Sequence, residues 1–136
     1  MVRLIMGGKG AGKTKQLIDL LHHAAQDEPG SVICIEAEQN MMFDIPYKIR
    51  LISARDYRLD SYDLFQGFIS GLYAGNYDIS HVFIDNFCKI VGRDVDSQTE
   101  TFLDWLDQFG ERNGVKFTVT LSADPSAATE GMRRYL

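Results

Sequence analysis

The sequence predicts an α/β fold in three layers, with a mostly parallel sheet of five strands between helices. Two observations lead to this prediction. Short apolar runs rich in β-branched residues alternate along the chain with longer stretches whose apolar residues recur at helical spacing. The apolar runs are nearly continuous, which is typical of strands buried on both faces. Since parallel neighbours need crossover connections, strands separated by helices indicate a parallel sheet.

The first half of the chain contains three predicted strands. Residues 2–6, VRLIM, form the first, and a helix around Leu17 and Leu21 follows and ends before Pro29 and Gly30. Residues 32–37, VICIEA, are a β-branched run with the character of a buried strand. After a loop, residues 48–53, KIRLIS, alternate and predict a weaker third strand.

The second half adds two helices and two strands. Asp60 is the expected N-cap of a helix that carries apolar residues from Leu64 to Tyr73. Residues 81–84, HVFI, predict the fourth strand, which ends on Asp85. A third helix, marked by Trp105 and its apolar neighbours, stops near residues 113–114, and FTVTL at 117–121 is the fifth strand.

Composition limits the class of protein. A chain of 136 residues, with 45% hydrophobic and 24% charged residues, fits one domain spanning residues 1–136. Its apolar runs are far shorter than the roughly 20 residues that cross a bilayer. The net charge of -5 argues against a broad surface for nucleic acid or anionic membrane. We therefore expect a soluble cytoplasmic protein with neither a membrane nor a nucleic-acid partner.

The loop after the first strand carries the strongest functional signal. Residues 7–14, GGKGAGKT, match the P-loop (Walker A) pattern between a predicted strand and a predicted helix. Glycines let the backbone wrap a phosphate chain, and the helix N-terminus favours the anion. Lys13 is expected to reach the terminal phosphates, and the Thr14 hydroxyl is placed for Mg²⁺. The remaining nucleotide contacts are expected from Gly7, Gly8, Lys9, Gly10, Ala11 and Gly12.

Asp85 is the candidate for the second metal-side group, the Walker B position. It follows four mostly apolar strand residues and would hold Mg²⁺ through water at the carboxyl end of the sheet. A carboxylate that leaves a hydrophobic strand needs a partner, because burying it alone is costly. The alternative interpretation is a turn or helix cap beside Asn86.

With these motifs the chain resembles a small P-loop NTPase, and its segment order over residues 2–123 is similar to the ATPase core of RecA-type recombinases. The resemblance implies the strand order 3-2-4-5-1, with ATP and Mg²⁺ as ligands. It also implies that Glu38, in IEAEQ at residues 35–39, activates the attacking water with Glu36 as a supporting carboxylate. A solvent-facing acidic loop is the alternative for these two residues.

The sequence departs from that family at two places. Asn86 stands directly after Asp85, where many P-loop ATPases carry Glu, so water activation must come from elsewhere or be poor. At the tip of the fifth strand the family places a polar pair that senses the terminal phosphate, and this chain has Ser122 and Ala123. Ser122 can supply one hydrogen bond.

The implied strand order leaves the first strand at a sheet edge, and a bare edge needs cover. Either the last residues, MRRYL, or a second subunit is expected there, the latter giving a homo-oligomer. Arg133 and Arg134 would then approach the phosphates, or else remain solvated. Residues 41–43, MMF, would form a hydrophobic lip for a partner or a base, or fold back over the core.

Three functions remain open from the sequence. The leading hypothesis is a slow, Mg²⁺-dependent ATPase or ATP-dependent switch. The second is a nucleotide-binding regulatory module with little turnover, which Asn86 and Ala123 favour. The third is a small-molecule, nucleoside-type kinase, for which no inserted arginine-rich lid is visible.

Overall fold

A computed structural model of the chain describes residues 1–38 and 44–136. The predicted lip at residues 41–43 lies outside the described residues. The main elements are β1 (Val2–Met6), α1 (Lys13–Asp27), β2 (Ser31–Glu36), β3 (Arg50–Ser53), α2 (Tyr62–Gly75), β4 (Ile79–Asp85), α3 (Phe87–Val91), α4 (Ser97–Asn113) and β5 (Lys116–Leu121). Short 3-10 turns occupy Ala54–Asp56 (η1), Pro125–Ala127 (η2) and Glu130–Tyr135 (η3).

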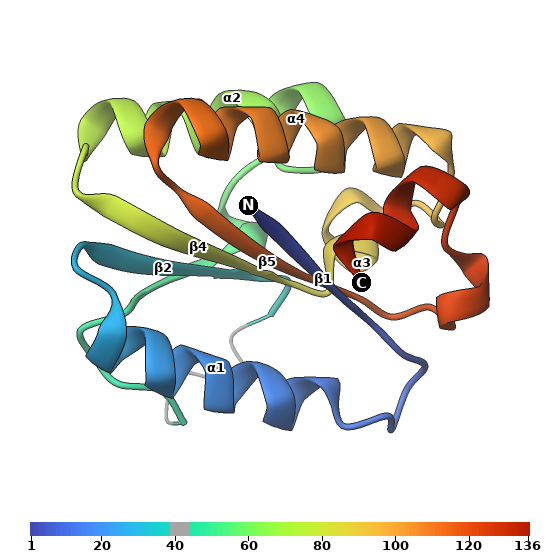
Figure 1. The fold of residues 1–136 in the computed structure, drawn as a ribbon, viewed down its shortest axis with the longest axis horizontal. Helices are drawn as coiled ribbons and strands as arrows, with labels where there is room; N and C mark the ends of the chain where they lie inside the picture. Colours follow the sequence, from blue (N-terminus) through green and yellow to red (C-terminus); the bar gives the residue numbers. More distant parts are fainter. Residues whose placement is uncertain (39–43) are drawn as a thin grey trace.

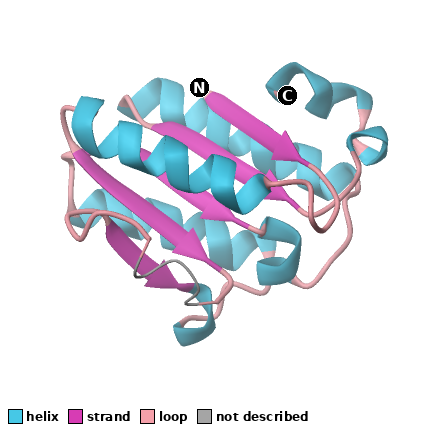
Figure 2. Ribbon diagram, turned by 90° about the horizontal axis from the view of Figure 1, so that it is seen from below, coloured by secondary structure: helices cyan, strands magenta, loops and turns pink. Residues whose placement is uncertain are grey.

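The five strands form one sheet in the order β1-β5-β4-β2-β3, and every neighbouring pair is parallel. The arrows in Figure 2 accordingly point in one direction. Counted from the β3 edge, the order is 3-2-4-5-1, so the order implied by the RecA-type resemblance is confirmed. All the strands therefore deliver their carboxyl ends to one edge of the sheet, where side chains distant in sequence meet.

Helices cover both faces of the sheet, with α1 on one side and α2 and α4 on the other (Figure 1). The core consequently has two parts. Under α1, Leu17 and Leu21 pack with Cys34 and Phe83. The opposite face holds a larger cluster that includes Ile84 of β4. Successive side chains of one strand point to opposite faces of the sheet and enter different clusters. The residues on both faces of a strand must therefore be apolar, which explains the unbroken apolar runs.

Local hydrogen bonds set the helix starts. The predicted N-cap Asp60 is wrong by one residue, since the Ser61 hydroxyl accepts from the Leu64 N–H at 3.1 Å. Asp96 and Thr99 form a capping box at the start of α4. The short helix α3 was not predicted. It begins after Asn86, whose left-handed backbone (φ 58°) turns the chain directly out of β4.

The C-terminal segment packs beside the edge strand β1 on the face that carries α4 (Figure 1). Met132 and Tyr135 are buried in the same cluster as Val2 and Leu4. Arg134 forms an ion pair with Asp104 of α4, so the expectation that it approaches the phosphates is not met within this chain. None of the helices in residues 1–38 and 44–136 combines the length and apolarity that a bilayer span requires.

Candidate functional site

The loop of residues 7–14 follows β1 and leads into α1, as the sequence predicts. Ala11 donates its backbone N–H to the Gly8 carbonyl at 3.1 Å, which closes a tight turn. Gly10 and Gly12 have φ angles of 86° and 81°, a left-handed region that favours glycine. Gly12 is also the N-cap of α1, so the glycine turns aim the first N–H groups of the helix at the loop.

The glycines of the loop differ in what surrounds them. A Cβ on Gly7 would lie 2.8 Å from the Ala11 Cβ, so the packing of the loop itself requires glycine there. A Cβ on Gly8, Gly10 or Gly12 would meet no atom within 4 Å. The loop is therefore closed on the Gly7 side and open on the other. An anion can approach backbone N–H groups from the open side, which fits a phosphate chain.

The charges around the loop also suit an anion. Lys13 folds back across the loop and donates its ammonium to the Gly8 carbonyl at 3.1 Å. The first turn of α1 carries no acidic residue, although acidic residues there would favour an isolated helix. Thr14, in the same turn, is exposed. The positive end of α1 is thus left for a ligand rather than neutralised within the chain.

Asp85 ends β4, which is separated from β1 in the sheet by β5 alone, and is held in place by Thr120 of β5. The buried Thr120 hydroxyl donates to the Asp85 carboxylate at 2.7 Å and accepts the Asn86 backbone N–H at 2.8 Å. The hydroxyl thus fixes both the carboxylate and the turn after it. Sequence reasoning missed Thr120, because a threonine within FTVTL looks like any β-branched strand residue.

Asn86 and Ser122 are joined at the carboxyl ends of β4 and β5. The Ser122 hydroxyl donates to the Asn86 side-chain oxygen at 3.1 Å. Asn86 is the one non-glycine residue with a positive φ among the described residues. A backbone held in this sparsely populated region beside a candidate metal carboxylate is the kind of strain found at functional sites. The two departures from the RecA-type pattern therefore contact each other.

Two candidate carboxylates leave β2 at the same edge. Glu36 is buried and lies opposite Asp85 in the register of β2 and β4. Glu38 is partly exposed and accepts from the Lys89 ammonium of α3 at 2.5 Å. Glu38 also borders a hollow of about 420 Å³, together with Lys89 and Arg55. Lys89 was not singled out from the sequence, because α3 was not expected.

The Asp85 and Glu36 carboxylates also act on the buried thiol of Cys34 in β2. Burial raises the pKa of Cys34 first, and the negative charges of Asp85 and Glu36 raise it further. Cys34 therefore stays a neutral thiol at physiological pH and is not a nucleophile. Within the described residues, no three His, Cys, Asp or Glu side chains come together as a metal site.

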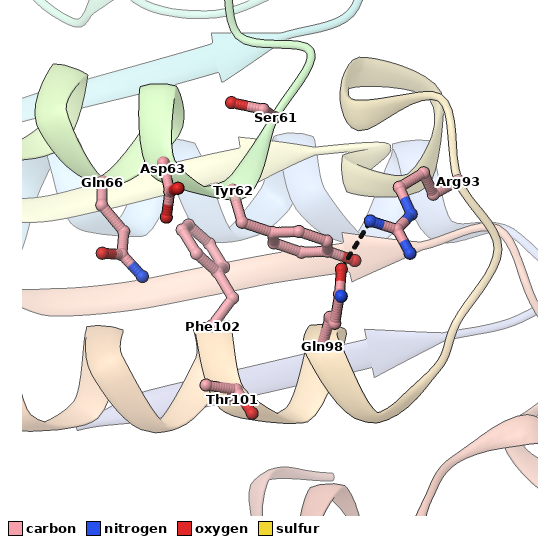
Figure 3. A pocket seen from close by; sticks show the side chains of 8 residues that line it. All are labelled: Ser61, Tyr62, Asp63, Gln66, Arg93, Gln98, Thr101 and Phe102. Carbon is pink, nitrogen blue, oxygen red and sulfur yellow. Dashed lines mark hydrogen bonds between the residues drawn. The ribbon is translucent and has the colours of Figure 1, made fainter.

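A second hollow, of about 340 Å³, lies between the N-terminal ends of α2 and α4 (Figure 3). Arg93 borders it, stacks over the Tyr62 ring at 5.5 Å and donates to Gln98 at 2.5 Å. None of the residues predicted for the nucleotide site lines this hollow. Its one arginine, Arg93, is already paired with Gln98, so the sheet edge that carries residues 7–14 remains the candidate site.

Comparisons with known proteins concern the fold. No family model matches the chain, and neither does any curated protein. Among solved structures, it is similar to a KaiC-like protein of the archaeon Pyrococcus horikoshii, with a TM-score of 0.67 and 17% identity over 98% of this chain and 68% of that one. It is also similar to the flagellar accessory protein FlaH of Methanocaldococcus jannaschii, with a TM-score of 0.56 and 13% identity over 98% of this chain and 65% of that one.

These likenesses confirm the three-layer α/β fold with its parallel sheet. The identities are low, and the chain spans only about two thirds of the length of either neighbour. The roles of individual residues therefore rest on the geometry of this chain.

Proposed function

We propose that the chain binds ATP with Mg²⁺ in the loop of residues 7–14 and hydrolyses it slowly, as an ATP-dependent switch. The observation that carries the proposal is the loop itself. Its left-handed glycines leave open space on one side, and the Lys13 side chain crosses the loop. The first turn of α1, which begins at Lys13, contains no acidic residue. This combination suits a chain of phosphates and little else.

The remaining roles follow from position at the carboxyl edge of the sheet. The Thr14 hydroxyl and the Asp85 carboxylate are hard oxygen ligands of the kind Mg²⁺ prefers, and Thr120 keeps the carboxylate in one orientation. Bound Mg²⁺ would neutralise charge on the phosphates. Ser122 and Asn86 are the polar groups available to sense the terminal phosphate. Lys9 is an exposed loop lysine that would touch phosphate.

Glu38 is the proposed general base, and its ion pair with Lys89 supports slow turnover. The Lys89 ammonium occupies the Glu38 oxygen that would otherwise accept a proton from water. Hydrolysis then requires Glu38 to exchange Lys89 for a water. The buried Glu36, opposite Asp85, would support the carboxylate arrangement from β2.

A second candidate function is a nucleotide-binding module with little turnover. The same Lys89–Glu38 ion pair favours it, together with Asn86 in the place of a catalytic Glu. In this case nucleotide binding alone, without hydrolysis, would change the conformation of the chain. The slow ATPase and the binding module differ in whether Glu38 contacts a water molecule beside the terminal phosphate.

One series of measurements separates these functions. Thermal unfolding is followed with ATP, ADP or GTP, each with and without Mg²⁺, for the wild type, Lys13→Ala, Glu38→Gln and Lys89→Met. Phosphate release and ADP formation are measured for the same four proteins, with and without an added nucleoside. We expect stabilisation by ATP with Mg²⁺ in all but Lys13→Ala, and slow release that Glu38→Gln abolishes.

Each other result has a distinct meaning. Stabilisation without phosphate release in any variant favours the binding module. ADP that forms only with an added nucleoside, without release of phosphate, favours the kinase, because the phosphoryl group then passes to the nucleoside. Faster release in Lys89→Met supports the role of the ion pair in limiting turnover. The absence of stabilisation by any nucleotide contradicts the proposal as a whole.

A further inference from the structure

Helix α2 has an outward face without charge. After Asp63 in its first turn, residues 64–75 include no charged side chain. Leu64 is 45% exposed, and Phe68 and Leu72 are only partly buried. A surface helix of a monomer normally carries charged residues opposite its buried face. The sequence of α2 instead resembles a helix that is covered on more than one side.

Glycines open this face further. Gly67, Gly71 and Gly75 are spaced four residues apart, and a Cβ on any of them would meet no atom within 4 Å. Apart from proline, glycine is the least favourable residue in a helix interior. Nothing within the described chain needs the space that these glycines leave. Such spacing lets a second backbone approach a helix closely.

A groove of about 610 Å³ runs beside this face, between α2 and the edge strand β3. Ile33, Ile52 and Tyr57 line it from the sheet side, and Phe68, Gly71 and Leu72 line it from α2. Its rim at the C-terminal end of α2 carries Lys48 and Arg50, which form no ion pair with any described residue. The groove is thus apolar along its length and basic at one end.

The face is complementary to itself. Its large residues, Leu64, Phe68 and Leu72, and its gaps, Gly67, Gly71 and Gly75, are each spaced four residues apart. When two copies of α2 pair antiparallel about a point between Phe68 and Gly71, each large residue of one helix faces a glycine of the other. Such pairing about a two-fold axis is the usual geometry of a homodimer.

The charges match in the same arrangement. Asp60 and Asp63 are exposed at the N-terminal end of α2, while Lys48 and Arg50 stand at its C-terminal end. Antiparallel pairing brings the acidic end of one copy to the basic end of the other. We propose that a second copy of this chain occupies the groove, through an antiparallel pairing of α2 with its counterpart about a two-fold axis between Phe68 and Gly71.

This dimer is distinct from assembly through the bare edge of β1, because β1 and β3 are opposite edges of the sheet. It leaves the P-loop uncovered and does not depend on the proposed nucleotide. The homodimer would place two nucleotide sites on the outside of one particle. Lys13→Ala is therefore expected to dimerise as the wild type does.

The test is sedimentation equilibrium of the full chain without nucleotide, over a range of concentrations. We expect twice the monomer mass of 15.4 kDa for the wild type. Gly71→Gln should sediment as a monomer that is folded, since the added side chain meets open space in the free chain. Ser70→Gln is the matched control, because Ser70 is exposed one position away on a different side of the helix, and it should remain dimeric.

Charge reversal tests the orientation. The double variants Lys48→Glu/Arg50→Glu and Asp60→Lys/Asp63→Lys should each be monomeric alone and form a heterodimer when mixed. A monomeric wild type at every concentration, or a dimer that persists in Gly71→Gln, overturns the proposal. A dimer lost in Gly71→Gln but not recovered by mixing the charge variants overturns the antiparallel orientation.

Discussion

Thr120 is the residue on which the geometry of the candidate site depends most directly. Its one hydroxyl donates to Asp85 and accepts from the Asn86 backbone N–H, in a buried position. We expect Thr120→Val to destabilise the protein by about 1–3 kcal/mol, because the part-buried Asn86 N–H and the Asp85 carboxylate both lose a partner without a change of shape. Unfolding in urea measures this loss.

The same variant should also weaken stabilisation by ATP with Mg²⁺, since Asp85 is free to rotate. Thr120→Ser keeps the hydroxyl and is the matched control, with both properties near those of the wild type. Equal stability of Thr120→Val and Thr120→Ser would show that the hydroxyl carries no part of the site's geometry.

Gly7 and Gly8 give a prediction about the loop, because they are neighbours with opposite surroundings. Gly7→Ala would place a Cβ 2.8 Å from Ala11, so the loop must shift. Gly8→Ala meets open space. We expect Gly7→Ala to lower the melting temperature of the nucleotide-free protein. Gly8→Ala should change the free energy of unfolding by less than about 0.5 kcal/mol, and its melting temperature should stay near that of the wild type. Calorimetry of both variants decides, and equal melting temperatures would contradict this account of Gly7.

At the scale of elements, a polar cluster ties the end of α1 to the sheet. Glu28, just after α1, accepts from Lys116 of β5 at 2.9 Å and lies 3.6 Å from the His81 ring of β4. His81 contacts Thr118 at 2.9 Å and stacks on Phe83 at 4.1 Å between ring centroids. Burial lowers the pKa of His81 to about 4, although Glu28 opposes that shift.

This cluster predicts how stability depends on pH. As pH falls below 6.5, the unfolded chain takes up a proton at His81 before the folded chain does, so stability is lost between pH 6.5 and about 4. The shift corresponds to about 3 kcal/mol at most. Burial raises the pKa of Glu28, but the hydrogen bonds from Lys116 and Ser80 and the nearby positive charge together outweigh burial and lower it. The contribution of Glu28 to stability is therefore lost only as the pH falls below its ordinary value of 4.5.

Urea unfolding at a series of pH values from 7 to 4 measures the effect. We expect His81→Gln to flatten the fall in stability, since the side chain no longer titrates. His23→Gln is the control, because His23 is an exposed histidine of α1, and it should follow the wild type. Parallel curves for His81→Gln and the wild type would contradict the assignment.

Most elements could be predicted from the sequence because their patterns are local. The five apolar runs and the three long helices repeat their periodicity over enough residues to be recognised, and the order of the strands followed from the P-loop resemblance. The two errors have different causes. Helix α3 spans five residues, which are too few to show a helical period. The N-cap of α2 is Ser61 and not Asp60, because only hydrogen-bond geometry distinguishes adjacent polar residues.

The candidate site was predictable only where a motif fixes its residues. GGKGAGKT locates the loop, and the strand order places Asp85 at the same edge. Thr120 and Lys89 carry no such motif, and they contact Asp85 and Glu38 from segments 35 and 51 residues away in sequence. Likewise, the cluster of Glu28, His81 and Lys116 joins three elements. Contacts of this kind depend on the fold and not on neighbouring residues.

At the scale of the molecule, the C-terminal segment closes the core beside β1. Met132 is fully buried and Tyr135 nearly so. The Tyr135 hydroxyl donates to Asp104 at 2.6 Å, and Thr129 donates to Glu100 at 2.6 Å, so η3 is attached to α4 by two carboxylates. The segment therefore covers β1 on one face of the sheet, whereas the P-loop leaves the carboxyl end of the same strand.

The last prediction separates this cover from the nucleotide site. We expect Met132→Ala to destabilise the chain by about 2–4 kcal/mol, because a fully buried side chain leaves a cavity. Leu136→Ala, at a residue 53% exposed, should cost less than about 0.5 kcal/mol and serves as the control.

Since η3 holds β1 from the face opposite α1, the stabilisation by ATP with Mg²⁺ should be retained in both variants. Urea unfolding gives the stabilities and titration calorimetry the affinities. A Met132→Ala protein that unfolds like the wild type would show that η3 is not part of the core, and one that folds but no longer binds ATP would show that the segment acts on the P-loop through β1.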